Sequence, residues 1–163
     1  MILDSIILCT LLITIVGSFW IILNMRKRAN NSLSFKESMD LTSLPVVTFY
    51  NNNIKLNFLL DTGSDDSRIN MSVLPLLKYE LLDFTRNTMS ILGEKALENQ
   101  YCSMTISYKQ QDFCADFSIG DFDEPFSAIK TESGVQIHGI LGSLFFQKYK
   151  YILDFENLTA YLK

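Results

Sequence analysis

The residues with the clearest chemical potential form the run Asp61-Thr62-Gly63-Ser64, which directly follows the apolar segment Asn57–Leu60. A carboxylate placed where a buried strand opens into a turn is partly desolvated, which can raise its pKa and suit it to act as a base. The glycine lets the backbone approach closely and orient its N–H groups. Ordinary turns are built from the same residue types, so this run alone leaves both interpretations open.

A second motif lies further along the chain. Gly139-Ile140-Leu141-Gly142 precedes a predicted helix over Ser143–Lys150 and predicted closing strands within Tyr151–Leu162. Together with the Asp61 run, this order resembles the retropepsin-like aspartic peptidases, the single-lobe relatives of pepsin. In that family an apolar strand leads into Asp-Thr/Ser-Gly, and a later apolar-apolar-Gly step passes beside that loop before a short helix and a closing strand. The resemblance covers about residues 44–163.

The resemblance implies a role for each residue of the two motifs. Asp61 would be the catalytic carboxylate, and Thr62 would hydrogen-bond to its counterpart in a second subunit. Gly63 would present its backbone N–H to the carboxylate, and Ser64 would be a hydrogen-bond partner of the same group. Three residues would support this loop from behind without taking part in the chemistry: Ile140, Leu141 and Gly142.

The single Asp-Thr-Gly in this chain implies a homodimer. The mechanism needs two carboxylates that share one proton around a water, so the second Asp61 would come from a second copy across a two-fold axis. A peptide or protein substrate would bind in an extended conformation, pairing with loop edges and with a flap expected near Leu92–Gln100. This segment departs from the family pattern, because retroviral flaps are glycine-rich and it holds only Gly93.

Strand-like segments dominate residues 44–163 and predict an all-β domain, a closed β-barrel or sandwich with one or two short helices. Pro45–Tyr50 and Ile54–Leu60 flank an Asn-Asn-Asn turn and predict a hairpin. Met71–Leu82 is expected to form a short helix with Ser72 as a plausible cap. The other expected strands are Thr88–Leu92, Tyr101–Tyr108, Phe113–Ile119, Tyr151–Phe155 and Leu158–Leu162.

The first 25 residues differ in composition from the rest of the chain. Residues 5–25 carry no charged side chain, and as a helix they would span roughly 30 Å, the thickness of the hydrocarbon core of a bilayer. The basic residues follow this segment, at positions 26–28, whereas a cleavable signal peptide, the rival interpretation, has them before a shorter apolar run. Because Lys and Arg stay on the cytoplasmic side, the sequence predicts a single-pass anchor with the catalytic domain in the cytosol.

The domain plan is therefore a transmembrane anchor over 1–25, a polar tether over 26–43 and a peptidase domain over 44–163. The chain has 163 residues and a net charge of −4, which argues against nucleic-acid binding. One histidine and no Cys-x-x-Cys exclude a usual zinc site, and we expect no metal or other cofactor.

Five further residues are expected to have no role in catalysis. Asp65 and Asp66 are expected to be solvated loop charges, although carboxylates beside the site could also oppose ionisation of Asp61. His138 is expected to be structural or on the surface. Cys102 and Cys114 are expected to pack as small hydrophobes.

These observations lead to one main functional hypothesis. The protein would be a membrane-anchored aspartic endopeptidase that hydrolyses peptide bonds with a water activated between two Asp61 carboxylates, one from each subunit. The alternative is a catalytically inactive pepsin-fold module for dimerisation or peptide binding, tethered to the membrane.

Overall fold

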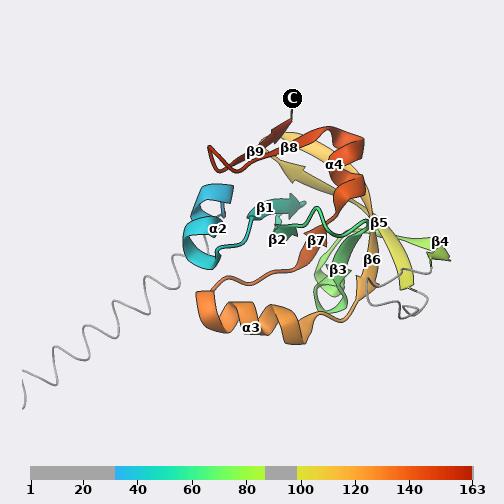
Figure 1. The fold of residues 1–163 in the computed structure, drawn as a ribbon. Coiled ribbons are helices and arrows are strands. Elements are labelled where there is room, and N and C mark those ends of the chain that lie inside the picture. Colours follow the sequence, from blue (N-terminus) through green and yellow to red (C-terminus); the bar gives the residue numbers. More distant parts are fainter. Residues whose placement is uncertain (1–31, 87–98, 163) are drawn as a thin grey trace, which may run out of the picture. The chain divides into compact units, whose positions relative to one another are not determined.

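The computed structural model describes residues 32–86 and 99–162 (Figure 1). The predicted anchor, most of the predicted flap and the expected strand Thr88–Leu92 lie outside these residues. Within the described ranges, no helix is long and apolar enough to cross a membrane.

Six strands form a closed β-barrel. They are β1 (Val46–Asn51), β2 (Ile54–Leu60), β3 (Ser67–Asn70), β5 (Asn99–Tyr108), β6 (Gln111–Gly120) and β7 (Gly139–Leu141). The hydrogen-bonded order is β1-β2-β7-β3-β6-β5, and pairing of Tyr50 with Ser107 joins β1 back to β5. β4 (Glu80–Arg86) pairs with β5 outside this ring. The predicted closed barrel is confirmed.

Two tight hairpins set the register of four barrel strands. In the predicted β1–β2 hairpin, Asn52 has a φ of +52°, a conformation that Asn tolerates. β5 and β6 join through Lys109 and Gln110, both with positive φ, as a two-residue turn requires. Alternation then places Leu56, Phe58 and Leu60 inside the barrel.

The barrel interior is filled largely by aromatic rings. Phe49 packs edge-to-face against Phe58 and Phe113, each with ring centroids 5.9 Å apart. Phe145 of α4 (Ser143–Tyr149) extends this cluster. The terminal hairpin, β8 (Tyr151–Asp154) with β9 (Thr159–Leu162), adds Tyr151 and Ala160. Burial of each such aromatic side chain contributes on the order of 2–3 kcal/mol. The helix and the closing strands predicted after Gly142 are confirmed.

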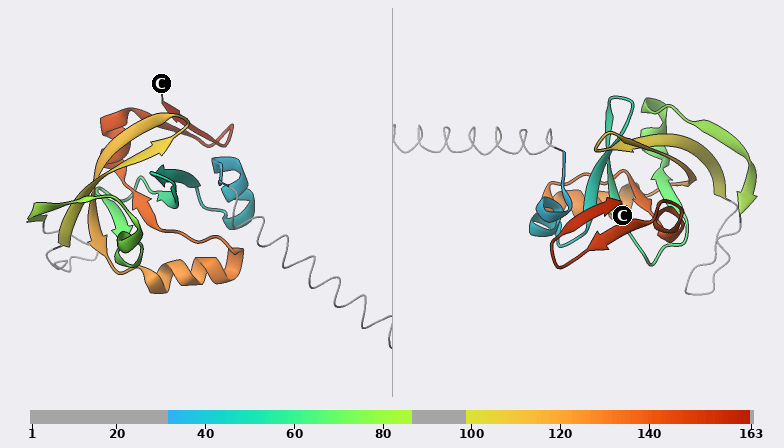
Figure 2. Two further views of the ribbon diagram at one scale, coloured as in Figure 1. Left: turned by 180° about the vertical axis from the view of Figure 1, so that it is seen from behind. Right: turned by 90° about the horizontal axis from the view of Figure 1, so that it is seen from above.

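A second apolar cluster lies outside the barrel, beneath α2 (Phe35–Thr42) and α3 (Asp123–Ser133). Its buried members are Val46, Phe126, Val135 and Ile137, and Leu59 and Ile140 of the barrel pack against them. Figure 2 shows α3 on the side of the domain opposite the β8–β9 hairpin. α3 was not predicted, so the described residues hold three α-helices where one or two were expected.

The helix expected over Met71–Leu82 does begin at Met71, but it is shorter than predicted and is not an α-helix. The chain forms a 3₁₀ helix, η1 (Met71–Leu76), and then enters β4 at Glu80. Pro75 lies inside η1 and has no N–H to continue a helical ladder. Ser72 does not cap the helix, because its hydroxyl donates to Asp123 Oδ1 at 2.9 Å.

Part of the segment preceding the barrel is ordered against it. Ser34 and Glu37 form a reciprocal capping box at the start of α2. Phe35 packs in the barrel's apolar cluster, and the Ser38 hydroxyl accepts a hydrogen bond from Val46 N–H at 2.9 Å. α2 is therefore held to the first residue of β1.

Candidate active site

The loop that carries Asp61 is shaped by an unusual strand order. β2 and β3 are consecutive in the chain, but β7 lies between them, parallel to β2 and antiparallel to β3. The connection over residues 61–66 must therefore pass across the end of β7. Asp61 N–H donates to Leu141 O at 3.0 Å, which extends the pairing of β2 and β7 by one residue. Asp61 thus stands at the first position of this crossing loop.

Gly142 lies directly against the crossing loop, where only glycine fits. A Cβ atom there would lie 2.5 Å from the Asp66 carbonyl oxygen and 2.7 Å from that of Asp65. The chain then turns into α4, whose first residues bind the loop: Ser143 N–H donates to Ser64 O at 2.7 Å, and Leu144 N–H donates to Asp65 O at 3.1 Å. The loop and the start of α4 are therefore locked together.

Asp61 is partly buried, and its carboxylate is oriented by its own loop. Its Oδ1 accepts a hydrogen bond from Gly63 N–H at 2.9 Å. A Cβ atom at Gly63 would lie 3.2 Å from the same oxygen, so a larger residue would crowd the carboxylate. This arrangement holds the carboxylate in a defined orientation.

Thr62 and Ser64 occupy different environments. Thr62 is exposed, at the tip of the loop beside Asp61. The Ser64 hydroxyl donates to Asp66 O at 2.9 Å, and its backbone N–H donates to Asp61 O at 3.3 Å. A hydrogen bond between Ser64 and the Asp61 carboxylate, and a contact of Thr62 with a second subunit, stay predictions.

The three residues expected behind the loop are all placed beside it. Leu141 is completely buried in the barrel core, and its carbonyl binds Asp61 as described. Ile140 faces the opposite side and packs against the second apolar cluster. Gly142 N–H donates to the Ser67 hydroxyl at 3.2 Å, which ties β7 to the start of β3.

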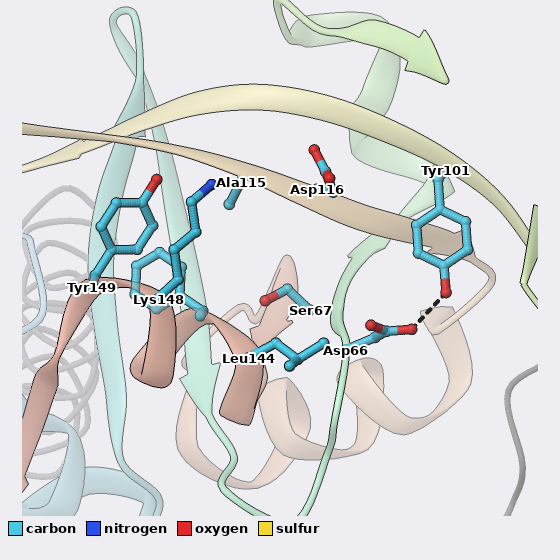
Figure 3. Close-up of a pocket in the computed structure, with 9 residues that line it drawn as sticks. Asp66, Ser67, Tyr101, Ala115, Asp116, Leu144, Lys148 and Tyr149 are labelled. Atoms are coloured by element: carbon cyan, nitrogen blue, oxygen red, sulfur yellow. Dashed lines mark hydrogen bonds between the residues drawn. The ribbon is translucent and has the colours of Figure 1, made fainter. Parts of the chain in front are cut away.

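Asp66 differs from the solvated charge that we expected. It is only 8% exposed, and its Oδ2 accepts a hydrogen bond from the Tyr101 hydroxyl at 2.6 Å (Figure 3). Tyr101 is itself buried, and a carboxylate in such a place requires hydrogen-bond donors. Asp65 is exposed as expected. No local pattern marks Tyr101, which lies 35 residues away from Asp66 in the sequence.

A cavity of about 160 Å³ lies between the crossing loop, α4, β5 and β6. Figure 3 shows the side chains around it, which come from Asp66, Ser67, Tyr101, Ala115, Asp116, Leu144, Phe145, Lys148 and Tyr149. Lys148 Nζ and the Tyr149 hydroxyl both donate to Cys114 O, at 2.7 and 2.5 Å. Asp61 does not line this cavity, so it is separate from the candidate catalytic carboxylate.

His138 has a structural role, as predicted. Its Nδ1 accepts a hydrogen bond from Asn57 N–H at 2.9 Å, which ties the segment before β7 to β2. Burial, with a smaller effect of Lys130, lowers the pKa of the imidazole below its ordinary value of 6.5. The neutral form that accepts this hydrogen bond is therefore favoured.

The two cysteines of the described domain have opposite environments. Cys102 is buried as expected, and burial, with a smaller effect of Asp116, raises the pKa of its thiol to about 11. Cys114 is exposed, so the expectation that it packs as a small hydrophobe is wrong. Within residues 32–86 and 99–162, no group of three His, Cys, Asp or Glu side chains could hold a metal ion.

Comparison with known proteins finds similarity at the level of structure. No protein-family model matches the chain. No curated protein matches it either. The structure is similar to those of retropepsin-like aspartic proteases. EIAV protease complexed with the inhibitor HBY-793 is 22% identical, with a TM-score of 0.47 over 64% of this chain and 86% of that one. The retroviral protease-like domain of Ddi1 from Leishmania major is 10% identical, with a TM-score of 0.47 over 74% of this chain and 88% of that one. A retropepsin-like aspartic protease from Rickettsia conorii is 19% identical, with a TM-score of 0.43 over 67% of this chain and 75% of that one.

Proposed function

We propose that this protein is an aspartic endopeptidase that works as a homodimer and is anchored to a membrane. One observation carries the proposal: the Asp61 carboxylate is held by Gly63 N–H on a loop that is locked to Gly142 and the start of α4. A rigid loop that presents an oriented carboxylate is what general acid–base chemistry on a bound water requires.

The second carboxylate of the reaction comes from a second chain. The described fold has one crossing loop with one Asp-Thr-Gly. A two-fold axis beside Asp61 would bring two copies of this carboxylate to about 3 Å, where they cannot both ionise and so share one proton. The exposed position of Thr62 supports this arrangement, because a residue next to Asp61 is accessible to a partner.

Peptide hydrolysis then uses the two carboxylates in different protonation states. The ionised Asp61 takes a proton from the bound water, and the water oxygen bonds to the carbon of the scissile amide. The protonated Asp61 gives its proton to the carbonyl oxygen, which forms a tetrahedral diol. Collapse of the diol breaks the C–N bond, and a proton passes to the leaving amine.

The substrate binds as an extended strand beneath a flap. Support comes from β4 and β5, which pair with each other in antiparallel orientation. The segment that connects them in the sequence contains most of the predicted flap. In the described sheet β4 is the outermost strand. Backbone pairing gives such a site affinity for peptides of many sequences, and pockets for alternate side chains give selectivity.

The membrane anchor is residues 5–25, and the catalytic domain faces the cytosol. The uncharged length of this segment and the basic residues at 26–28 support the proposal. Confinement of two copies to one membrane raises their effective concentration and favours the dimer.

The test uses the full-length chain in detergent and an unfolded protein as substrate. Wild-type protein is expected to cleave it, with inhibition by a statine-containing peptide, and Asp61→Asn is expected to abolish cleavage without changing the circular dichroism spectrum. Asp65→Asn is the matched control, because Asp65 is an exposed carboxylate on the same loop. Cleavage that survives Asp61→Asn would show that Asp61 is not the catalytic group.

A further inference from the structure

Arg68 is a cation on the strand that leaves the crossing loop. It is the second residue of β3 and is partly buried. Its Nε atom is buried and has no hydrogen-bond partner in the part of the chain that the structure describes. Buried donors without a partner are rare in folded proteins, so this atom calls for an explanation.

The strand register places Arg68 and Asp61 on the same face of the sheet. Arg68 pairs with Ile140, and Ile140 pairs with Leu59, so these three side chains form one row. The neighbouring row, with Leu60 and Leu141, points into the barrel. Because side chains alternate along a strand, Asp61, two residues after Leu59, lies on the outer face with Arg68.

The distance between the two residues follows from sheet geometry. They lie two strands apart and two residues apart along the strands. With about 4.8 Å between strands and about 3.3 Å per residue, their Cα atoms are about 12 Å apart. An extended peptide covers this distance in about three to four residues, and the long arginine side chain shortens it further. At this separation, a long side chain on β3 could contact substrate residues close to the scissile bond.

The Asp66 carboxylate, which lies close to Arg68 along the chain, accepts a hydrogen bond from a neutral side chain. Ser118 pairs directly with Arg68, and Tyr101 pairs with Ser118. Asp66, two residues before Arg68, accepts the hydrogen bond from Tyr101. The Asp66 carboxylate thus has a donor in the protein, whereas the Arg68 Nε lacks an acceptor within the described residues. A carboxylate is the acceptor that the planar donor groups of an arginine match best.

We propose that Arg68 is a specificity-determining residue that selects peptides with an Asp or Glu side chain near the scissile bond. The inference rests on the proposed function, because it takes Asp61 as the centre of the cleft. A two-fold dimer carries one Arg68 on each side of the scissile bond. The preference for acidic side chains is therefore expected on both sides of the bond.

The test compares matched peptides that differ only by Glu or Gln at the second residue on either side of the scissile bond. For the full-length protein, we expect kcat/KM to be about tenfold or more higher for the Glu peptides, as for a charge-assisted hydrogen bond. Arg68→Gln is expected to bring the ratio close to one, and Arg68→Glu to favour Lys peptides. Lys109→Gln is the control, because Lys109 is an exposed cation on the β5–β6 turn.

A binding measurement separates failure of this inference from failure of the proposed function. Fluorescence anisotropy would follow labelled Glu and Gln peptides in which statine replaces the scissile residue. Cleavage without a Glu preference, or a preference that survives Arg68→Gln, overturns the role of Arg68 alone. A Glu preference in binding that depends on Arg68, without cleavage, supports Arg68 and overturns the catalytic proposal. If the protein shows no cleavage and no preferential binding of Glu peptides, both proposals are overturned.

Discussion

Substitution of Gly142 by alanine tests the reasoning about the crossing loop most directly. The new Cβ would lie 2.5 Å from the Asp66 carbonyl oxygen and 2.7 Å from that of Asp65. Ordinary van der Waals contact begins at about 3.4 Å, so the loop must move by about 0.7–0.9 Å. Both oxygens are backbone atoms that accept hydrogen bonds, from Ser64 Oγ and from Leu144 N–H. Relief of the clash therefore strains these bonds.

The expected loss of stability for Gly142→Ala is about 1–3 kcal/mol, the range for inserting a methyl group into a packed site. The loop that moves also carries Asp61, and misplacement of a reacting group by about 1 Å can lower the rate about 100-fold. We therefore expect kcat/KM to fall by one to two orders of magnitude even in the fraction of protein that is folded. Urea unfolding followed by circular dichroism measures the first effect, and peptide cleavage under native conditions measures the second.

Gly134→Ala is the matched control for this substitution. Gly134 ends α3 with a φ of +74°, and no other group lies within 4 Å of a Cβ built there. Alanine in this left-handed conformation costs about 1–2 kcal/mol without a steric clash. Gly134→Ala should thus lose comparable stability but keep its activity. Equal activity of Gly142→Ala and wild type would refute the view that Gly142 positions the loop.

Three further predictions concern groups around the site. Tyr101→Phe removes a hydrogen bond to the buried Asp66 carboxylate and should lower the free energy of unfolding by about 1.5–3 kcal/mol, which urea denaturation would measure; an unchanged midpoint would contradict it. The pKa of His138 is lowered in the folded state, so below about pH 6.5 the unfolded chain takes up a proton that the folded chain does not. Stability should therefore fall as the pH is lowered through this range, and His138→Gln should lose this part of the pH dependence. Urea unfolding of both proteins at pH 7.5 and 5.5 measures the effect. If the loss of stability between the two pH values is the same in the wild type and in His138→Gln, the role of His138 is contradicted. In a Cys9→Ser background, a thiol reagent should label the exposed Cys114 rapidly and Cys102 only on unfolding, because Cys102 is buried with a thiol pKa of about 11. Mass spectrometry counts the labels. Rapid labelling of both cysteines in the folded protein would contradict the burial of Cys102.

Much of the barrel could be predicted from local sequence. The Asn-Asn-Asn turn and the alternation of Ile54–Leu60 specify the first hairpin, because turn chemistry and a period of two are short-range properties. The segment after Gly142 could be recognised as a helix for a similar reason. The helix α3 could not, because Phe126 is its only buried residue and Ile129 is only partly buried, and two such positions make a weak periodic signal.

The residues of the candidate site divide in the same way. The sequence by itself determined that an acidic residue follows an apolar strand and precedes Thr-Gly-Ser. Only the tertiary structure decided that β7 lies between β2 and β3, which brings Gly142 against the loop and Arg68 onto the face of Asp61. It also decided that Asp66 is buried against Tyr101. The physical reason is that strand order and burial depend on contacts between residues far apart in the chain, and no local pattern of residue types encodes them.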